Sequence, residues 1–244
     1  NYVKRCVGIP GDKIELIEGQ LMVNNAPQKE PEGMKKQWHY DVSTKGTGLN
    51  PNILQEKYDI TEGGYGRNQN EYNLTLTNES RDALKTFPNV TAINKRLEKA
   101  DVYADYIFPH DENFKWNVDN YGPIIIPKKG ATIKITKENI ALYKDIIQRY
   151  EGNNLAIRLP SISAVFNQDK FDKKVLKQYP DDMTDYPLEE GLEQASLGIA
   201  GLKDDKITFV INGEPATSYT FQMNYYWMMG DNRHNSADSR FWGF

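Results

Sequence analysis

Residues 1–25 read NYVKRCVGIPGDKIELIEGQLMVNN, and this stretch indicates how the chain begins to fold. Apolar and polar residues alternate in short runs, a pattern typical of β-strands that bury one face. The runs are interrupted by Pro10-Gly11-Asp12 and by Glu18-Gly19, combinations that favour tight turns. We therefore predict a meander of short strands over residues 2–26.

The other end of the chain has the same texture. An apolar run at residues 207–211 is followed by Asn212-Gly213 and then by a second β-like run at residues 218–221. An Asn-Gly pair between two such runs is a strong hairpin signal, because both residues tolerate positive φ. We predict a hairpin between these runs, and a mainly β fold for the protein.

The long middle of the chain differs from both ends. It is polar and rich in Asn and Lys, and its clearest helical pattern begins at Thr136, as N-cap, and ends at Tyr150. Residues 179–191 are acidic with two prolines, which predicts a surface loop. We expect residues 1–27 and 204–244 to form a catalytic β core, with an inserted α+β domain of unknown role at 28–203.

Composition excludes several classes of function. The 30 basic and 34 acidic residues are mixed along the chain, so no nucleic-acid partner is expected. Apolar runs such as residues 124–126 are far shorter than the roughly 20 residues that span a bilayer. The single cysteine, Cys6, rules out an internal disulfide. No Cys/His cluster has zinc-site spacing, and we expect no metal or cofactor.

Lys4 is the first candidate for chemistry. On a strand it shares a face with Tyr2 and Cys6, while Arg5 points to the opposite face. One of the two cations therefore points inward. The alternative interpretation is a solvated lysine on an edge strand, where lysine discourages aggregation.

The loop of residues 230–240, called loop 230–240 below, is the second candidate, since it is unusually dense in polar residues. One interpretation is a loop that only satisfies its own backbone. A calcium loop is excluded, because Arg233 and Ala237 stand where oxygen ligands would be needed. His234 has no second histidine nearby, which favours a hydrogen-bonding role over metal ligation.

Together, residues 2–12 (YVKRCVGIPGD) and 230–244 (GDNRHNSADSRFWGF) resemble two motifs of bacterial type I signal peptidases. The resemblance implies a twisted antiparallel β core and a serine endopeptidase with a Ser/Lys dyad. It also implies the substrates, which are the signal peptides of secreted preproteins. The expected location is the bacterial inner membrane, with the catalytic region facing the periplasm.

Residue roles follow from the resemblance position by position. Lys4 is the expected general base, and Ser236 is expected to orient its amine. The base must be neutral to act, and Tyr2, Cys6 and Phe241 are the candidates for an apolar wall around it. Structural support is expected from five loop residues: Asp231, Asn232, Arg233, Asp238 and Arg240.

The sequence departs from the family in one respect. The family's nucleophile stands in a Ser-Met-x-Pro segment upstream of the lysine, and no serine of this chain has that context. We expect the nucleophile, and the transmembrane anchor that joins the family to the membrane surface, to lie before residue 1. The chain alone is then expected to be inactive, as a piece of a longer protein.

Two other functions are alternatives. Self-cleaving repressor-type proteases use the same dyad on a related β frame, but they lack the Gly-Asp-Asn-Arg loop. A non-enzymatic envelope or peptide-binding module on a vestigial peptidase scaffold would make the insertion the working part. The intact Lys4 and loop 230–240 argue against it, since a scaffold would not require them.

Overall fold

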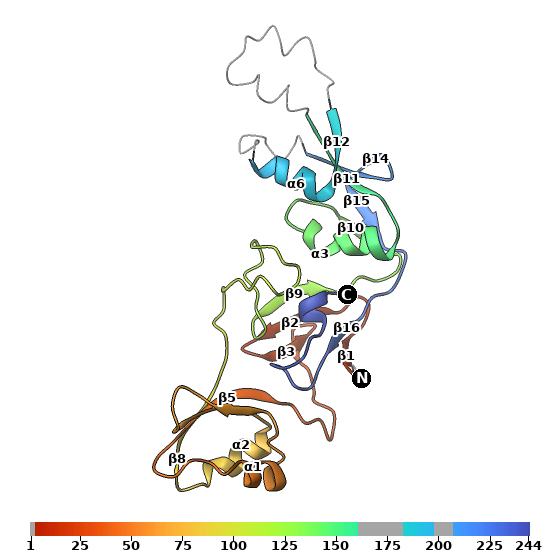
Figure 1. Cartoon of the computed structure of the whole chain (residues 1–244). Helices are drawn as coiled ribbons and strands as arrows, with labels where there is room; N and C mark the ends of the chain where they lie inside the picture. The colour runs from red at the N-terminus through yellow and green to blue at the C-terminus, as the bar shows by residue number, and fades with distance from the viewer. Residues whose placement is uncertain (1–2, 161–182, 198–206) are drawn as a thin grey trace. The chain divides into compact units, whose positions relative to one another are not determined.

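The computed structural model describes residues 3–160, 183–197 and 207–244 (Figure 1). Residue contacts divide the chain into two compact units. The first holds Asn1–Ile126 and Tyr225–Phe244, and the second holds Pro127–Asn224. The described sheets are antiparallel and strands predominate, so the predicted mainly β fold with an antiparallel core and a large α+β insertion is confirmed. The exact limits of the insertion stay a prediction, and its expected later boundary falls outside the described residues.

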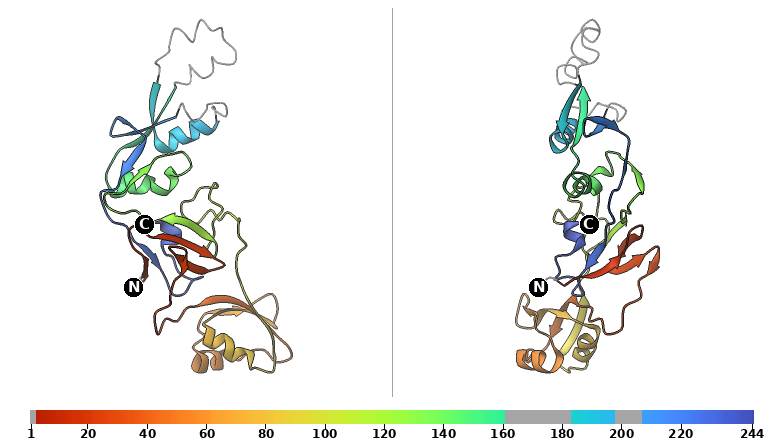
Figure 2. Two further views of the ribbon diagram at one scale, coloured as in Figure 1. Left: turned by 180° about the vertical axis from the view of Figure 1, so that it is seen from behind. Right: turned by 90° about the vertical axis from the view of Figure 1, so that its right-hand side faces the viewer.

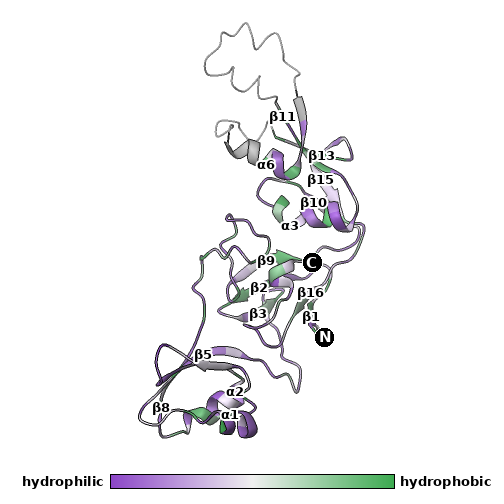
Figure 3. Cartoon of the chain, viewed as in Figure 1, coloured by the Kyte–Doolittle hydropathy of each residue, from purple (hydrophilic) through white to green (hydrophobic). Residues whose placement is uncertain are grey.

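The first unit is built around a four-stranded antiparallel sheet of order β4-β3-β2-β9. Its strands are β2 (Lys13–Ile17), β3 (Gln20–Val23), β4 (Ala26–Pro27) and β9 (Tyr121–Ile125). Ile14 and Leu16 are buried while Lys13 and Glu15 are partly exposed, as alternation along a strand requires. Figure 3 shows this mixture of hydrophobic and hydrophilic residues along the central strands. β2, β3 and β4 form the predicted meander.

The first strand, β1 (Arg5–Gly8), does not open this meander, so that part of the prediction is wrong. It pairs instead with β16 (Trp227–Met229), with Arg5 opposite Met229. The Pro10-Gly11-Asp12 turn separates β1 from β2, and its Gly11 amide donates to the Ile126 carbonyl at 2.8 Å. This pairing brings the start of the chain against loop 230–240.

Residues 37–96, called the accessory module below, add a second sheet to the first unit. The sheet has the order β6-β7-β5-β8, and two helices lie against it (Figure 2). Its elements are β5 (Trp38–Thr44), α1 (Pro51–Tyr58), β6 (Gly63–Tyr65), β7 (Glu71–Leu76), α2 (Asn78–Lys85) and β8 (Val90–Lys95). Leu54 of α1 and Leu84 of α2 are buried with Tyr40 and Leu74 of the sheet. The helices therefore cover one face of the sheet.

The second unit contains another four-stranded sheet, of order β12-β11-β13-β14, and a separate pair, β10-β15. Its strands are β10 (Thr132–Lys134), β11 (Leu155–Pro160), β12 (Met183–Pro187), β13 (Thr208–Ile211), β14 (Glu214–Ala216) and β15 (Ser218–Thr220). Asn212 and Gly213 have φ of 53° and 87°, the positive values that a tight hairpin needs. The turn joins β13 to β14, so the predicted hairpin partner at 218–221 is wrong.

The helices of the second unit also differ from the prediction. The helix expected from Thr136 begins at Ile140, as α3 (Ile140–Asp145). Residues 137–139 form a turn, in which the Asn139 side chain accepts from the Thr136 amide. The helix continues as the π-helix η1 (Ile146–Tyr150) and ends where predicted.

The surface loop predicted at residues 179–191 is wrong over its described part, which forms β12 and the start of α6 (Leu188–Leu197). Among the described strands β12 pairs with β11 alone, and an edge strand tolerates a proline such as Pro187 at its end. Residues 179–182 lie outside the described residues.

Candidate active site

Lys4 and Ser236 come together beside Gly230. The pairing of Arg5 with Met229 places Lys4 opposite Gly230 one step further along the two strands. A Cβ atom built on Gly230 would overlap Ser236 Oγ and would lie 3.6 Å from Lys4 Cδ. The lysine stem and the serine hydroxyl thus share the space that only glycine leaves open at this position.

Ser236 is buried, with 8% of its surface exposed, whereas Lys4 is partly exposed. Ser236 Oγ has no hydrogen-bond partner among the described residues. The two side chains are therefore adjacent, and the Ser236 hydroxyl is available to an amine. Of the residues expected to wall Lys4, Cys6 is exposed and Phe241 stacks on Tyr106, while Tyr2 lies outside the described residues.

A buried ion pair holds the end of loop 230–240. Asp238 and Arg240 have no exposed side-chain surface, and two bonds of 2.8 and 2.9 Å join them. Asp238 also accepts from the Gly230 amide at 3.1 Å, and Arg240 donates to the Val118 and Arg233 carbonyls at 3.0 and 2.6 Å. The pair thereby ties Gly230 to the end of the loop.

A partly exposed ion pair holds the start of the loop. The Arg5 guanidinium donates to both carboxylate oxygens of Asp231, at 3.1 and 2.8 Å. These hydrogen bonds, and then the charge of Asp231, raise the pKa of Arg5 above its ordinary value. Because Arg5 follows Lys4, the pair helps to keep the lysine in register with Gly230.

Arg233 does not join either ion pair. It is 2% exposed, its Nη1 lies 3.5 Å from Met229 Sδ, and its Nε has no hydrogen-bond partner among the described residues. Burial, followed by the nearby charge of Arg240, lowers the pKa of Arg233 to about 10. Its carbonyl rather than its side chain supports the site, by accepting from Arg240.

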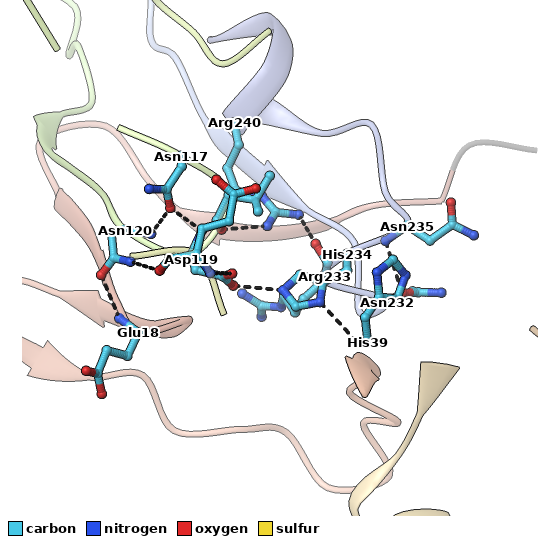
Figure 4. A network of polar contacts seen from close by, with 12 residues as sticks. Glu18, His39, Asn117, Asp119, Asn120, Asn232, Arg233, His234, Asn235 and Arg240 are labelled. Carbon is cyan, nitrogen blue, oxygen red and sulfur yellow. Dashed lines mark hydrogen bonds and ion pairs between the residues drawn. The ribbon is translucent and has the colours of Figure 1, made fainter. Parts of the chain in front are cut away.

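His234 lies in a polar network that sequence reasoning missed, and Figure 4 shows it. Its Nδ1 accepts from the His39 amide at 3.0 Å, so the proton must be on Nε2, which lies 2.8 Å from Asp119 Oδ1. The second Asp119 oxygen accepts from the Glu98 amide at 2.9 Å. Asn117 orders the same segment by accepting from the Asp119 and Asn120 amides. The dense polar run at residues 117–120 was the signal available in the sequence.

Asn232 reaches a further residue that was not predicted. Its side-chain amide donates to Glu62 of the accessory module at 3.0 Å, and Asn235 donates to the same carboxylate oxygen at 3.0 Å. Loop 230–240 is thus in contact with the accessory module as well as with the β core. Within the described ranges, no three His, Cys, Asp or Glu side chains are grouped so as to hold a metal ion.

A lysine and a serine that meet on an antiparallel β frame are typical of serine hydrolases that use lysine in place of histidine. The family model described as "Signal peptidase, peptidase S26" matches residues 1–119 and 122–244. The chain belongs to this family of serine peptidases. No solved structure matches the chain. None of the helices in the described residues is long and apolar enough to cross a membrane.

Proposed function

We propose that the chain is the catalytic region of a bacterial type I signal peptidase, which cleaves signal peptides from exported preproteins. One observation carries the proposal: the Lys4 side chain and the Ser236 hydroxyl meet beside Gly230, in a chain that the family model matches over almost its whole length. Lys4 is the general base, and Ser236 orients it. Asp231, Asn232, Arg233, Asp238 and Arg240 hold the loop that presents Ser236.

In the proposed reaction, the neutral Lys4 amine takes the proton of a serine hydroxyl as the serine oxygen attacks the scissile carbonyl. The resulting ammonium gives a proton to the leaving amine, the peptide C–N bond breaks and an acyl-enzyme remains. Lys4 then activates a water that hydrolyses the ester. Ser236 Oγ and the lysine stem both lie beside Gly230, and on this proposal the hydroxyl holds the amine in its reactive direction.

We place the nucleophilic serine outside residues 1–244, because no serine of the chain stands in a Ser-Met-x-Pro segment. On this proposal the chain is inactive by itself. The full-length protein is attached to the bacterial inner membrane by a transmembrane anchor, and its catalytic region faces the periplasm.

Complementation tests the proposal. The full-length gene, with Lys4→Ala or Ser236→Ala, is expressed in cells depleted of their own signal peptidase, and preprotein processing is followed. Lys4→Ala should abolish processing, whereas Ser236→Ala should reduce it, since an orienting group contributes less than the base. Lys13→Ala, in β2 of the same unit, is the matched control and should process normally. Retained processing with Lys4→Ala would overturn the mechanism.

A further inference from the structure

Glu62 of the accessory module has a fixed backbone. Thr61 separates it from Ile60, a buried core residue, and its carbonyl accepts from the Thr75 amide of β7 at 3.1 Å. The next residue, Gly63, has a φ of 126°, and a Cβ there would lie 2.8 Å from the Leu74 Cα. The chain at Glu62 therefore sits so close to β7 that only glycine can follow it. The carboxylate is presented from a rigid support.

The Glu62 carboxylate closes a ring of hydrogen bonds with loop 230–240. One oxygen, Oε2, accepts from both the Asn232 and the Asn235 side-chain amides. Asn232 completes the ring, because its Oδ1 accepts from the Asn235 backbone amide at 3.2 Å. This last bond also decides the orientation of the Asn232 amide, since its oxygen faces Asn235 and its nitrogen faces Glu62.

Two backbone contacts hold the same stretch of loop. The Gln37 amide donates to the Asp231 carbonyl at 3.1 Å, and the Arg233 amide donates to the Gln37 carbonyl at 3.0 Å. These bonds fix the backbone on either side of Asn232. Asn235, by contrast, is exposed, and within the described part of the chain its hydrogen bonds run to Asn232 and Glu62. The position of Asn235 thus depends on Glu62 more than that of its neighbours does.

We propose that Glu62 is a positioning residue for the active site, acting through Asn235 on the adjacent Ser236. The inference rests on the proposed function, in which Ser236 orients Lys4. A carboxylate acceptor makes stronger hydrogen bonds than a neutral one, and it holds Asn235 in a single orientation. Without it, Asn235 is released, and the Ser236 hydroxyl spends less time directed at the lysine amine. On this proposal the accessory module contributes to peptidase activity.

Kinetics of the full-length protein on a synthetic signal-peptide substrate test the effect on the reaction. Glu62→Ala should lower kcat by roughly three- to tenfold, because the lost bonds are charge-assisted but solvent-exposed, with KM changed less than twofold. Glu62→Gln should restore most of kcat, since its amide oxygen can still accept. Glu56→Ala, an exposed carboxylate of α1 in the same module, is the matched control and should leave kcat unchanged.

A double variant separates positioning from a general loss of structure. If Glu62 acts through Asn235, then Glu62→Ala combined with Asn235→Ala should be no slower than Asn235→Ala alone. Additive losses in kcat would overturn the inference. Equal kcat for Glu62→Ala and the wild-type protein would also overturn it.

Hydrogen exchange of the Asn235 backbone amide tests the same contact without any need for catalysis. Its exchange should be faster in Glu62→Ala than in Glu56→Ala, because the Asn232 acceptor is no longer held. If Lys4→Ala retains activity, the proposed function fails while faster exchange still supports the contact. If activity depends on Lys4 but exchange at Asn235 is unchanged in Glu62→Ala, the positioning role alone fails.

Discussion

The two halves of loop 230–240 are held by ion pairs of similar geometry and opposite surroundings. At the end of the loop, Asp238 and Arg240 approach to 2.8 Å with no exposed side-chain surface. At its start, Asp231 and Arg5 also approach to 2.8 Å, but their side chains are 33% and 39% exposed. The distance between the charged groups is the same in both pairs, so it does not decide how much each pair contributes to stability. A buried charge that loses its partner stays uncompensated, whereas an exposed one is rehydrated.

Ser236 lies between these two halves. Asp238 holds the Gly230 amide beside it, whereas Asp231 and Asn235 bond to the partly exposed Arg5 and the exposed Glu62. We therefore expect the buried pair to decide whether the site forms, and the exposed contacts to tune it.

Breaking the buried pair should give the largest effect. Arg240→Ala leaves Asp238 buried without a counter-charge and should lower the free energy of unfolding by about 3–5 kcal/mol. Urea denaturation of the purified chain at pH 7 measures it. The double variant Asp238→Ala, Arg240→Ala should be less destabilised than the sum of the two single variants. A loss below about 1 kcal/mol for Arg240→Ala would contradict the comparison.

Lys95 adds a third case to the comparison of buried and exposed charges, because this half-buried cation contacts an aromatic ring instead of a carboxylate. Its Nζ lies 3.3 Å from the centre of the Trp38 ring. Burial lowers the pKa of Lys95 to about 8, a shift that the charge of Asp119 opposes and those of Lys36 and Arg81 reinforce. Between pH 8 and about 10.5 the unfolded chain holds a proton that the folded chain has lost, so stability gains from raising the pH.

The measurement is urea denaturation of the wild-type chain and Lys95→Met at pH 7.5 and pH 10. The wild type should gain on the order of 1 kcal/mol relative to the variant as the pH rises, a figure discounted for solvent screening of a half-exposed group. Other groups that titrate in this range are common to both proteins and cancel in the difference. If the wild type instead gained stability relative to Lys95→Met as the pH falls, the folded state would favour the charged form of Lys95, contrary to the prediction.

Breaking the exposed pair should give the smallest effect. Asp231→Asn removes the charge partner of Arg5 and should lower the free energy of unfolding by less than about 1 kcal/mol. Repeating the denaturation in 1 M NaCl should shrink the difference further, because salt screens exposed charges. A loss above about 2 kcal/mol, insensitive to salt, would mean that this pair behaves as a buried one.

Local features of the chain were largely predictable from the sequence. Alternation predicted β2 and β3, the Asn212-Gly213 pair predicted a tight turn, and the motifs around Lys4 and in loop 230–240 indicated the family. These signals are readable because each depends on residues that are neighbours in the chain.

Partners distant in the sequence were decided only by the tertiary structure. β1 pairs with β16, Glu62 meets Asn235, and His234 faces Asp119 across 115 positions. The sequence by itself indicated several of the strands and turns, and which residue types are available for chemistry. The tertiary structure decided which of them meet, because strand pairing and burial depend on how whole elements pack.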